Sequence, residues 1–201
     1  MKRMMFIIAI LVVIVAGCKK QENYQTATDT SATSTSATAT ETTTTTTGTV
    51  AGTMLSDKDK DFVTDAGKGG KGEVELAQDA VSHASNADVK AFAQKLIDDH
   101  GKANQELAQL AATKGVTIPT EMVAKMKEAK ERLMKLTGKS FDQAFIKQMV
   151  EDHTNTIKMF EDEAKIAGDS DVKSFIDKTL PTLREHLKRA KELETKLGKS
   201  K

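Results

Sequence analysis

The sequence predicts an all-α fold, a bundle of four long helices with a shorter connecting helix between the second and the third. Three observations support it. Apolar residues recur with the 3.6-residue period of amphipathic helices across residues 55–198. No segment there shows the polar–apolar alternation of a half-buried strand. Glycines follow the periodic segments, where a residue with positive φ often ends a helix, at Gly115, Gly138, Gly168 and Gly198.

Capping side chains mark where the helices begin, because they can accept hydrogen bonds from the free N–H groups of a first turn. The candidates are Ser56 for the first helix, Asn86 or Asp88 for the second, Ser140 with Gln143 as a capping box for the fourth, and Asp169 or Ser170 for the last. Together these signals predict helices over residues 57–85, 88–114, 120–137, 140–167 and 171–197. One connection that crosses the bundle, between the second and third long helices, is typical of ferritin-like folds.

The N-terminus predicts a lipoprotein signal peptide over residues 1–17. Lys2 and Arg3 precede an apolar run, residues 4–16, that is shorter than the roughly 20 residues a membrane-spanning helix needs. The run ends in Val-Ala-Gly-Cys, which resembles the lipobox of bacterial lipoproteins, so Cys18 is the expected lipidation site and the membrane an expected partner. Lys19 is compatible with an anchor in the outer membrane that faces the periplasm. The alternative is an ordinary signal peptide with a chance cysteine.

Residues 18–54 form the expected tether between the lipidated cysteine and the helical domain at 55–198. The segment consists largely of Thr, Ser and Ala, with six consecutive threonines at 42–47. Such a composition buries too little apolar surface to offset the entropy of ordering the chain. We therefore expect a disordered linker with a span of roughly 30 Å.

Cysteine count and net charge exclude several function classes. Cys18 is the only cysteine, so the helical domain can have neither a disulfide nor a thiolate metal ligand. Without Lys2 and Arg3, 28 basic residues remain against 29 acidic ones. This near-neutral balance does not indicate the basic surface that is typical of nucleic-acid-binding proteins. No motif identifies a protein partner.

Three of the four histidines lie on the apolar faces of predicted helices. At 100° per residue, His100, His153 and His186 each fall within an apolar stripe, near the middle of its helix. Glu73 interrupts the stripe of the first helix at a similar height, whereas His83 lies about 120° away from that stripe and is expected at the surface. Because all four polar residues are central, they should share one layer inside the bundle.

One carboxylate and three imidazoles suit a transition metal ion, which could be zinc, copper, iron or manganese. A carboxylate precedes each of these three histidines, and Asp99, Asp152 and Glu185 could orient a neighbouring imidazole as hydrogen-bond acceptors, although exposure to solvent is the simpler role. The alternative to metal binding is a structural layer in which the four groups satisfy one another. No histidine has Glu three residues before it, which argues against di-iron chemistry. Because the sequence shows no substrate cleft, we do not expect an enzyme.

Four motifs in order resemble a known bacterial family. They are GEVEL at 72–76, FAQKLIDDH at 92–100, FDQAF with MVEDH at 141–153, and LPTLREHL at 180–187. Together they resemble domain of unknown function 4142 over residues 55–197. The resemblance implies an exported ferritin-like bundle without an established activity. The family's motif glutamate and histidines fall on Glu73, His100, His153 and His186.

The glycine-rich segment GKGGKG at 67–72 formally matches a dinucleotide-binding loop. Such a loop follows a strand, and the residues before this one do not form a strand pattern. We interpret the glycines as a kink or a close approach between helices beside Glu73.

Overall fold

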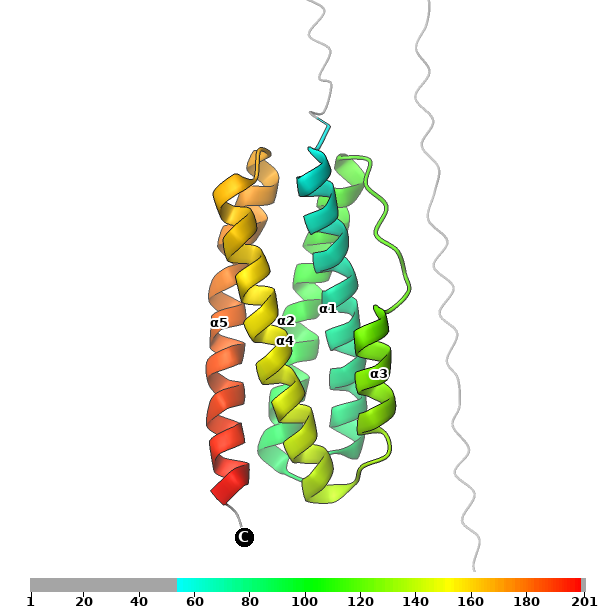
Figure 1. Ribbon diagram of the computed structural model, residues 1–201, viewed down its shortest axis with the longest axis vertical. Helices are drawn as coiled ribbons and strands as arrows, with labels where there is room; N and C mark the ends of the chain where they lie inside the picture. Colours follow the sequence, from blue (N-terminus) through cyan, green and yellow to red (C-terminus); the bar gives the residue numbers. More distant parts are fainter. Residues whose placement is uncertain (1–53, 200–201) are drawn as a thin grey trace, which may run out of the picture. The chain divides into compact units, whose positions relative to one another are not determined.

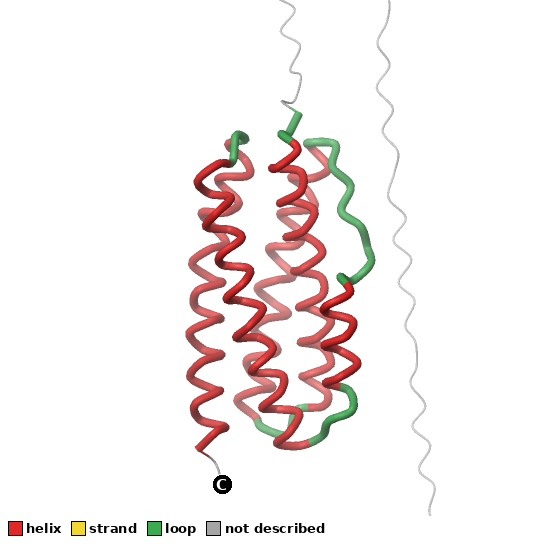
Figure 2. The backbone as a smooth tube through the Cα atoms, in the orientation of Figure 1, coloured by secondary structure: helices red, strands yellow, loops and turns green. Residues whose placement is uncertain are grey.

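The computed structural model describes residues 54–199, which contain five α-helices and no strand. The helices are α1 (Asp57–His83), α2 (Ala87–Thr113), α3 (Ala124–Leu133), α4 (Gly138–Ile166) and α5 (Ser170–Lys199). Figure 2 shows that short loops join them, apart from the longer connection between α2 and α3. The predicted signal peptide, Cys18 and nearly all of the tether lie outside the described residues. None of the described helices is long and apolar enough to span a membrane.

The four long helices run side by side (Figure 1). α1 packs against α2, and α4 packs against α5, as two antiparallel hairpins. Contacts between α2 and α5 and between α1 and α4 join the hairpins, so the order around the bundle is α1, α2, α5, α4. The connection at 114–123 returns along the outside of the bundle and leads into α3, which packs against α1 and α4. The predicted all-helical bundle is therefore present.

The apolar interior consists of two clusters at opposite ends of the bundle. The α1–α2 loop cluster contains Leu76, Ala77, Ala80, Ala84, Val89, Phe92, Ala93, Leu96, Leu133, Phe141, Phe145, Ile146, Met149, Ala190, Leu193 and Leu197. The α4–α5 loop cluster contains Leu55, Phe62, Val63, Ala66, Leu107, Ala111, Ile157, Phe160, Ala167, Val172, Phe175, Ile176, Leu180 and Leu183. Each long helix passes from one cluster to the other near its middle. A polar layer occupies the space between them.

Three of the predicted caps are confirmed. The Ser56 hydroxyl accepts from Asp59 N at 3.1 Å, and Asn86 Oδ1 accepts from Asp88 N at 2.9 Å. At α5, Asp169 Oδ1 accepts from the backbone N–H groups of residues 171 and 172 at 2.8 and 3.2 Å. These caps satisfy donors that the first turn of a helix leaves free.

The capping box predicted at Ser140 is wrong. α4 begins at Gly138, where φ is 57°, so Ser140 already lies within the first turn and not before it. Gln143 donates instead to the Leu197 carbonyl oxygen at 3.1 Å. α3 is also shorter than predicted at both ends, since neither residues 120–123 nor residues 134–137 belong to it, and Val123 provides no side-chain cap.

Two of the four glycines predicted to have positive φ do so. Gly115 and Gly138 have φ of 68° and 57°. Gly168 and Gly198 are not among the positive-φ glycines of the described residues, so that prediction is wrong for both. Gly198 lies inside α5, which continues to Lys199.

The glycine-rich segment of α1 permits close packing, in agreement with the second of the two sequence-based interpretations. α1 is continuous through residues 67–72. A Cβ atom at Gly67 would lie 2.6 Å from Ile118 Cγ2, and one at Gly72 would overlap Met126 Sδ. The absence of side chains at these two positions therefore allows the connection and α3 to pack directly on α1, beside Glu73.

Candidate metal centre

The layer between the two clusters contains one polar side chain from each long helix. Glu73 comes from α1, His100 from α2, His153 from α4 and His186 from α5, with exposed fractions of 2%, 6%, 0% and 1%. The predicted convergence of these four residues is therefore present. His83, by contrast, is exposed at the end of α1, as expected.

The side chains of the layer lie within direct contact of one another. His153 Nε2 is 3.4 Å from His100 Nε2 and 3.3 Å from His186 Nδ1. One nitrogen from each imidazole can be chosen so that all three lie within 4.8 Å of one another. Glu73 Oε2 is 3.0 Å from His100 Nε2, and Glu73 Oε1 is 3.8 Å from His153 Nδ1.

Two hydrogen bonds at the edge of the layer fix the tautomers of His153 and His186. His153 Nδ1 lies 3.0 Å from the Met149 carbonyl oxygen, which can only accept, so Nδ1 carries the hydrogen. His186 Nε2 lies 2.8 Å from Asp99 Oδ2 and donates to it. Lys95 donates to the same Asp99 oxygen at 2.8 Å. In the neutral imidazoles, the lone pairs are therefore on His153 Nε2 and His186 Nδ1, which face each other.

Burial shifts the pKa values in this region. It lowers the pKa of His100, against the opposing charge of Glu73. It lowers the pKa of His186 to about 4, although the hydrogen bond to Asp99 opposes this change. Burial raises the pKa of Asp99, but hydrogen bonds from Lys95 and His186 outweigh it, so that this pKa is below its ordinary value. His100 and His186 are therefore neutral near pH 7.

The three carboxylates that precede the histidines differ in position. Asp99 on α2 hydrogen-bonds to His186 on the neighbouring helix α5, and not to His100, the next residue in the sequence. Asp152 is buried and accepts from the Gln148 amide at 3.0 Å. Burial raises the pKa of Asp152 to about 6, against that hydrogen bond. Glu185 is exposed. Among the described hydrogen bonds, neither Asp152 nor Glu185 reaches a histidine.

The nitrogen separations fit a tetrahedral ion better than a square or octahedral one. With metal–nitrogen bonds of about 2.0–2.1 Å, tetrahedral ligands are separated by about 3.3 Å and ligands at right angles by about 2.9 Å. The two closest pairs, at 3.4 and 3.3 Å, match the tetrahedral value. The third pair lies within 4.8 Å, so a small inward movement of His100 or His186 would complete the set.

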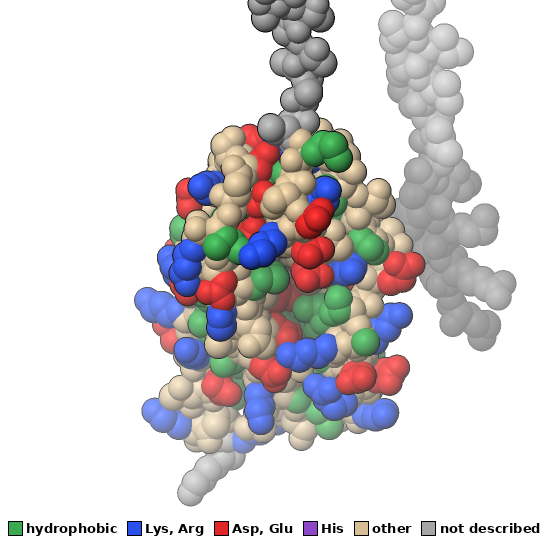
Figure 3. All heavy atoms as spheres, turned by 45° about the horizontal axis from the view of Figure 1, so that its top comes forward, with side chains coloured by type: hydrophobic (Ala, Val, Ile, Leu, Met, Phe, Trp, Pro, Cys, Tyr) green, Lys and Arg blue, Asp and Glu red, His purple; other side chains and the backbone are tan. Residues whose placement is uncertain are grey.

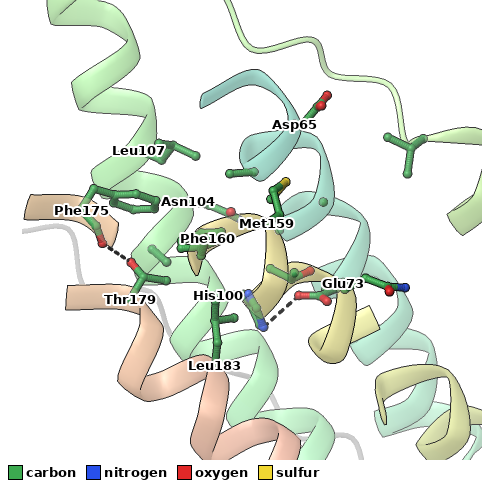
Figure 4. A pocket seen from close by; sticks show the side chains of 17 residues that line it. Asp65, Glu73, His100, Asn104, Leu107, Met159, Phe160, Phe175, Thr179 and Leu183 are labelled. Atoms are coloured by element: carbon green, nitrogen blue, oxygen red, sulfur yellow. Dashed lines mark hydrogen bonds and ion pairs between the residues drawn. The ribbon is translucent and has the colours of Figure 1, made fainter. Parts of the chain in front are cut away.

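Two cavities reach the layer, and no sequence pattern indicated either of them. One, of about 340 Å³, ends at Glu73 and His100 and is lined by all four long helices (Figure 4). The other, of about 150 Å³, lies between α2 and α5 and reaches His100 and His186 past Asp99 and Lys102. Outside these cavities, acidic and basic side chains are intermixed on the face in Figure 3.

Comparison with known proteins supports the fold and gives no activity. The family model described as "Domain of unknown function (DUF4142)" matches residues 44–193. No curated protein matches. The crystal structure of a DUF305 fragment from Deinococcus radiodurans is similar with a TM-score of 0.64 and 13% sequence identity, covering 73% of this chain and 99% of that chain. At this identity, the likeness concerns the fold alone.

Proposed function

The chain belongs to the DUF4142 family, and from that premise we propose that it binds a divalent transition metal ion through His100, His153 and His186, with Glu73 as the fourth ligand. The ion that best suits the layer is Zn²⁺, because imidazole and carboxylate are common zinc ligands and the nitrogen separations are tetrahedral. The function is metal buffering, sensing or stress protection. No catalytic step is part of this proposal.

The proposal is carried by the contact between His153 Nε2 and His186 Nδ1, which lie 3.3 Å apart. In the tautomers given above, each of these two nitrogens has its lone pair directed at the other. Two acceptors at this distance repel each other unless a proton or a metal ion lies between them. His186 brings no proton to this contact near pH 7, because burial lowers its pKa to about 4 and its Nε2 hydrogen is donated to Asp99. A metal ion provides the positive charge that the arrangement lacks.

Asp99 supports this role by positioning His186. A metal-binding histidine commonly donates its other N–H to a carboxylate, which fixes the tautomer and makes the ligand nitrogen more basic. Asp99 Oδ2 accepts from His186 Nε2 at 2.8 Å. The smaller cavity reaches His100 and His186, and its charged lining residues are Asp99, Lys102, Glu106 and Lys178.

A purely structural polar layer is the second candidate. Each imidazole has a contact within the protein, namely Glu73 for His100, the Met149 carbonyl for His153 and Asp99 for His186. In this alternative, the layer fixes the register of the four helices. It leaves the repulsion between His153 and His186 without compensation.

The bacterial cell envelope is the location that we propose for this bundle, on the basis of the lipobox-like sequence. A ferritin-like bundle would be held by the lipid on Cys18, through the tether, at the periplasmic face of the outer membrane. Labelling with a radioactive fatty acid would test the anchor, and a Cys18→Ala variant should lose the label. Retention of label in that variant would exclude Cys18 as the lipidated residue.

Elemental analysis of the purified protein tests metal binding directly. We expect near-stoichiometric zinc in the wild type and little in a His100→Ala/His153→Ala variant that retains its helical circular dichroism. A His83→Ala variant is the matched control, because His83 is exposed outside the layer, and it should retain the metal. Equal, negligible metal in wild type and the double variant would exclude the proposal. Equal loss of thermal stability with and without chelator would favour the structural alternative.

A further inference from the structure

The larger of the two cavities has the dimensions and lining of a small-molecule site. Its volume is about 340 Å³, within the range of roughly 300–1,000 Å³ that is common for ligand pockets. Apolar side chains from α2, α4 and α5 form much of its wall, namely Leu107, Met159, Phe160, Phe175 and Leu183. Figure 4 shows them around the cavity, with Glu73 and His100 at one end.

Glu73 is one of the lining residues of this cavity, and one of its two carboxylate oxygens has no hydrogen-bond partner within residues 54–199. The residue is only 2% exposed, and Oε1 has no hydrogen-bond partner in the described part of the chain. The other oxygen, Oε2, lies 3.0 Å from His100 Nε2. A buried acceptor without a donor is unfavourable, so a donor brought by a ligand would be bound preferentially.

The charge of the lining argues against an anionic ligand. The cavity is lined by the carboxyl groups of Glu73 and Asp65, and no Lys or Arg is among its lining residues. An anion would therefore enter without a compensating cation. The apolar wall favours a molecule that is largely hydrocarbon.

We propose that this cavity binds a small, largely apolar molecule that carries no negative charge and has a hydroxyl or N–H donor, as in a phenol, and that the donor hydrogen-bonds to the Glu73 carboxylate. This goes beyond metal binding, because the apolar wall of the cavity is formed by residues other than the four proposed metal ligands. Binding of the molecule is therefore expected in the metal-free protein as well.

Gly69 offers a way to fill the cavity. It lines the cavity, and a Cβ atom at this position would meet no atom within 4 Å. Because a Cβ atom there has open space, we expect a Gly69→Leu side chain to extend into the cavity. Gly101 is a matched control, because it is also helical and a Cβ atom there would likewise meet no atom within 4 Å, but it does not line the cavity.

Isothermal titration calorimetry on the EDTA-dialysed protein tests the proposal with β-naphthol, its methyl ether and β-naphthoate. These probes share one ring system and differ in the group that would meet Glu73. We expect β-naphthol to bind about tenfold more tightly than the ether, which lacks the donor, and β-naphthoate to bind most weakly. Gly69→Leu should weaken β-naphthol binding at least about tenfold, and Gly101→Leu should leave it unchanged.

Several outcomes would overturn the inference. These are no binding of β-naphthol, equal affinity for the three probes, tightest binding of β-naphthoate, or equal effects of the two glycine substitutions. A Glu73→Leu variant adds a second test, because it should bind the ether and β-naphthol equally. Zinc content is measured separately, so failure of the metal proposal and failure of this one are distinguishable.

Discussion

The stability of the metal-free protein should depend on pH through His186. Burial lowers the pKa of this residue from 6.5 to about 4 in the folded state. Between these values, the unfolded chain binds a proton that the folded protein does not. The free energy of unfolding therefore falls as pH decreases through this window, and the contribution of His186 levels off below about pH 4. At about 1.4 kcal/mol per pH unit, the loss is about 3 kcal/mol.

Asp152 acts in the opposite direction and must be separated from this effect. Burial raises its pKa from 3.8 to about 6. The folded protein thus binds a proton that the unfolded chain releases between these values, and the contribution of Asp152 to stability rises as pH falls through them. The two contributions largely cancel in the wild type between about pH 6 and pH 4. A comparison with a variant that lacks only His186 is therefore required.

A His186→Gln variant isolates the histidine, because Gln can still donate to Asp99 but does not titrate. Urea denaturation in the presence of EDTA should show that the wild type loses about 3 kcal/mol more than the variant between neutral pH and pH 4. His83→Gln, at an exposed position, should follow the wild type. A difference between wild type and His186→Gln that stays within about 1 kcal/mol over this range would refute the reasoning.

Two further substitutions test local interactions elsewhere in the bundle. Asp142 is 1% exposed and accepts from Ser85 N at 2.9 Å and from Asn86 N at 3.0 Å. Asp142→Ala should therefore lower the free energy of unfolding by about 3 kcal/mol in urea denaturation. A loss below about 0.5 kcal/mol would contradict this. Gly101→Ala should raise that free energy by about 1 kcal/mol, because the residue is helical and a Cβ there meets no atom within 4 Å; a destabilised variant would show that the space is not free.

The layer could be predicted from the sequence because it depends on only two properties of each helix. Periodicity placed His100, His153 and His186 on apolar faces, and the nearly equal lengths of the long helices placed them at mid-height. Any arrangement of four such helices, parallel or antiparallel, brings central residues to the same level. Glu73 followed from the same reasoning, since it interrupted an apolar stripe at the same height.

The partner of each residue could not be predicted, because it depends on which helices are neighbours. Asp99 hydrogen-bonds to His186 only because α2 packs against α5. Periodicity shows that Asp99 points away from the stripe of its own helix, and it contains no information about the adjacent helix. The cavities were missed for a similar reason, since they arise where side chains from several helices fail to fill the interior.

The local error at α4 shows that two valid signals can compete. Ser140 and Gln143 have the spacing of a capping box, but Gly138 precedes them and adopts a φ of 57°. A glycine in this conformation reverses the chain without a side-chain cap. The helix consequently begins at Gly138, and the hydrogen-bonding capacity of Gln143 is used at the C-terminal end of α5.

The position of the layer is itself an argument for function. Apolar residues at these four positions would join the two clusters into one continuous core, and burial of each large side chain would contribute about 1.5–3 kcal/mol. The chain instead places three histidines and a glutamate there, almost completely buried. Register alone can be specified by a single buried polar residue. Four such residues that converge, with two lone pairs facing each other and an acceptor left without a donor, match the local inconsistencies that are typical of binding sites.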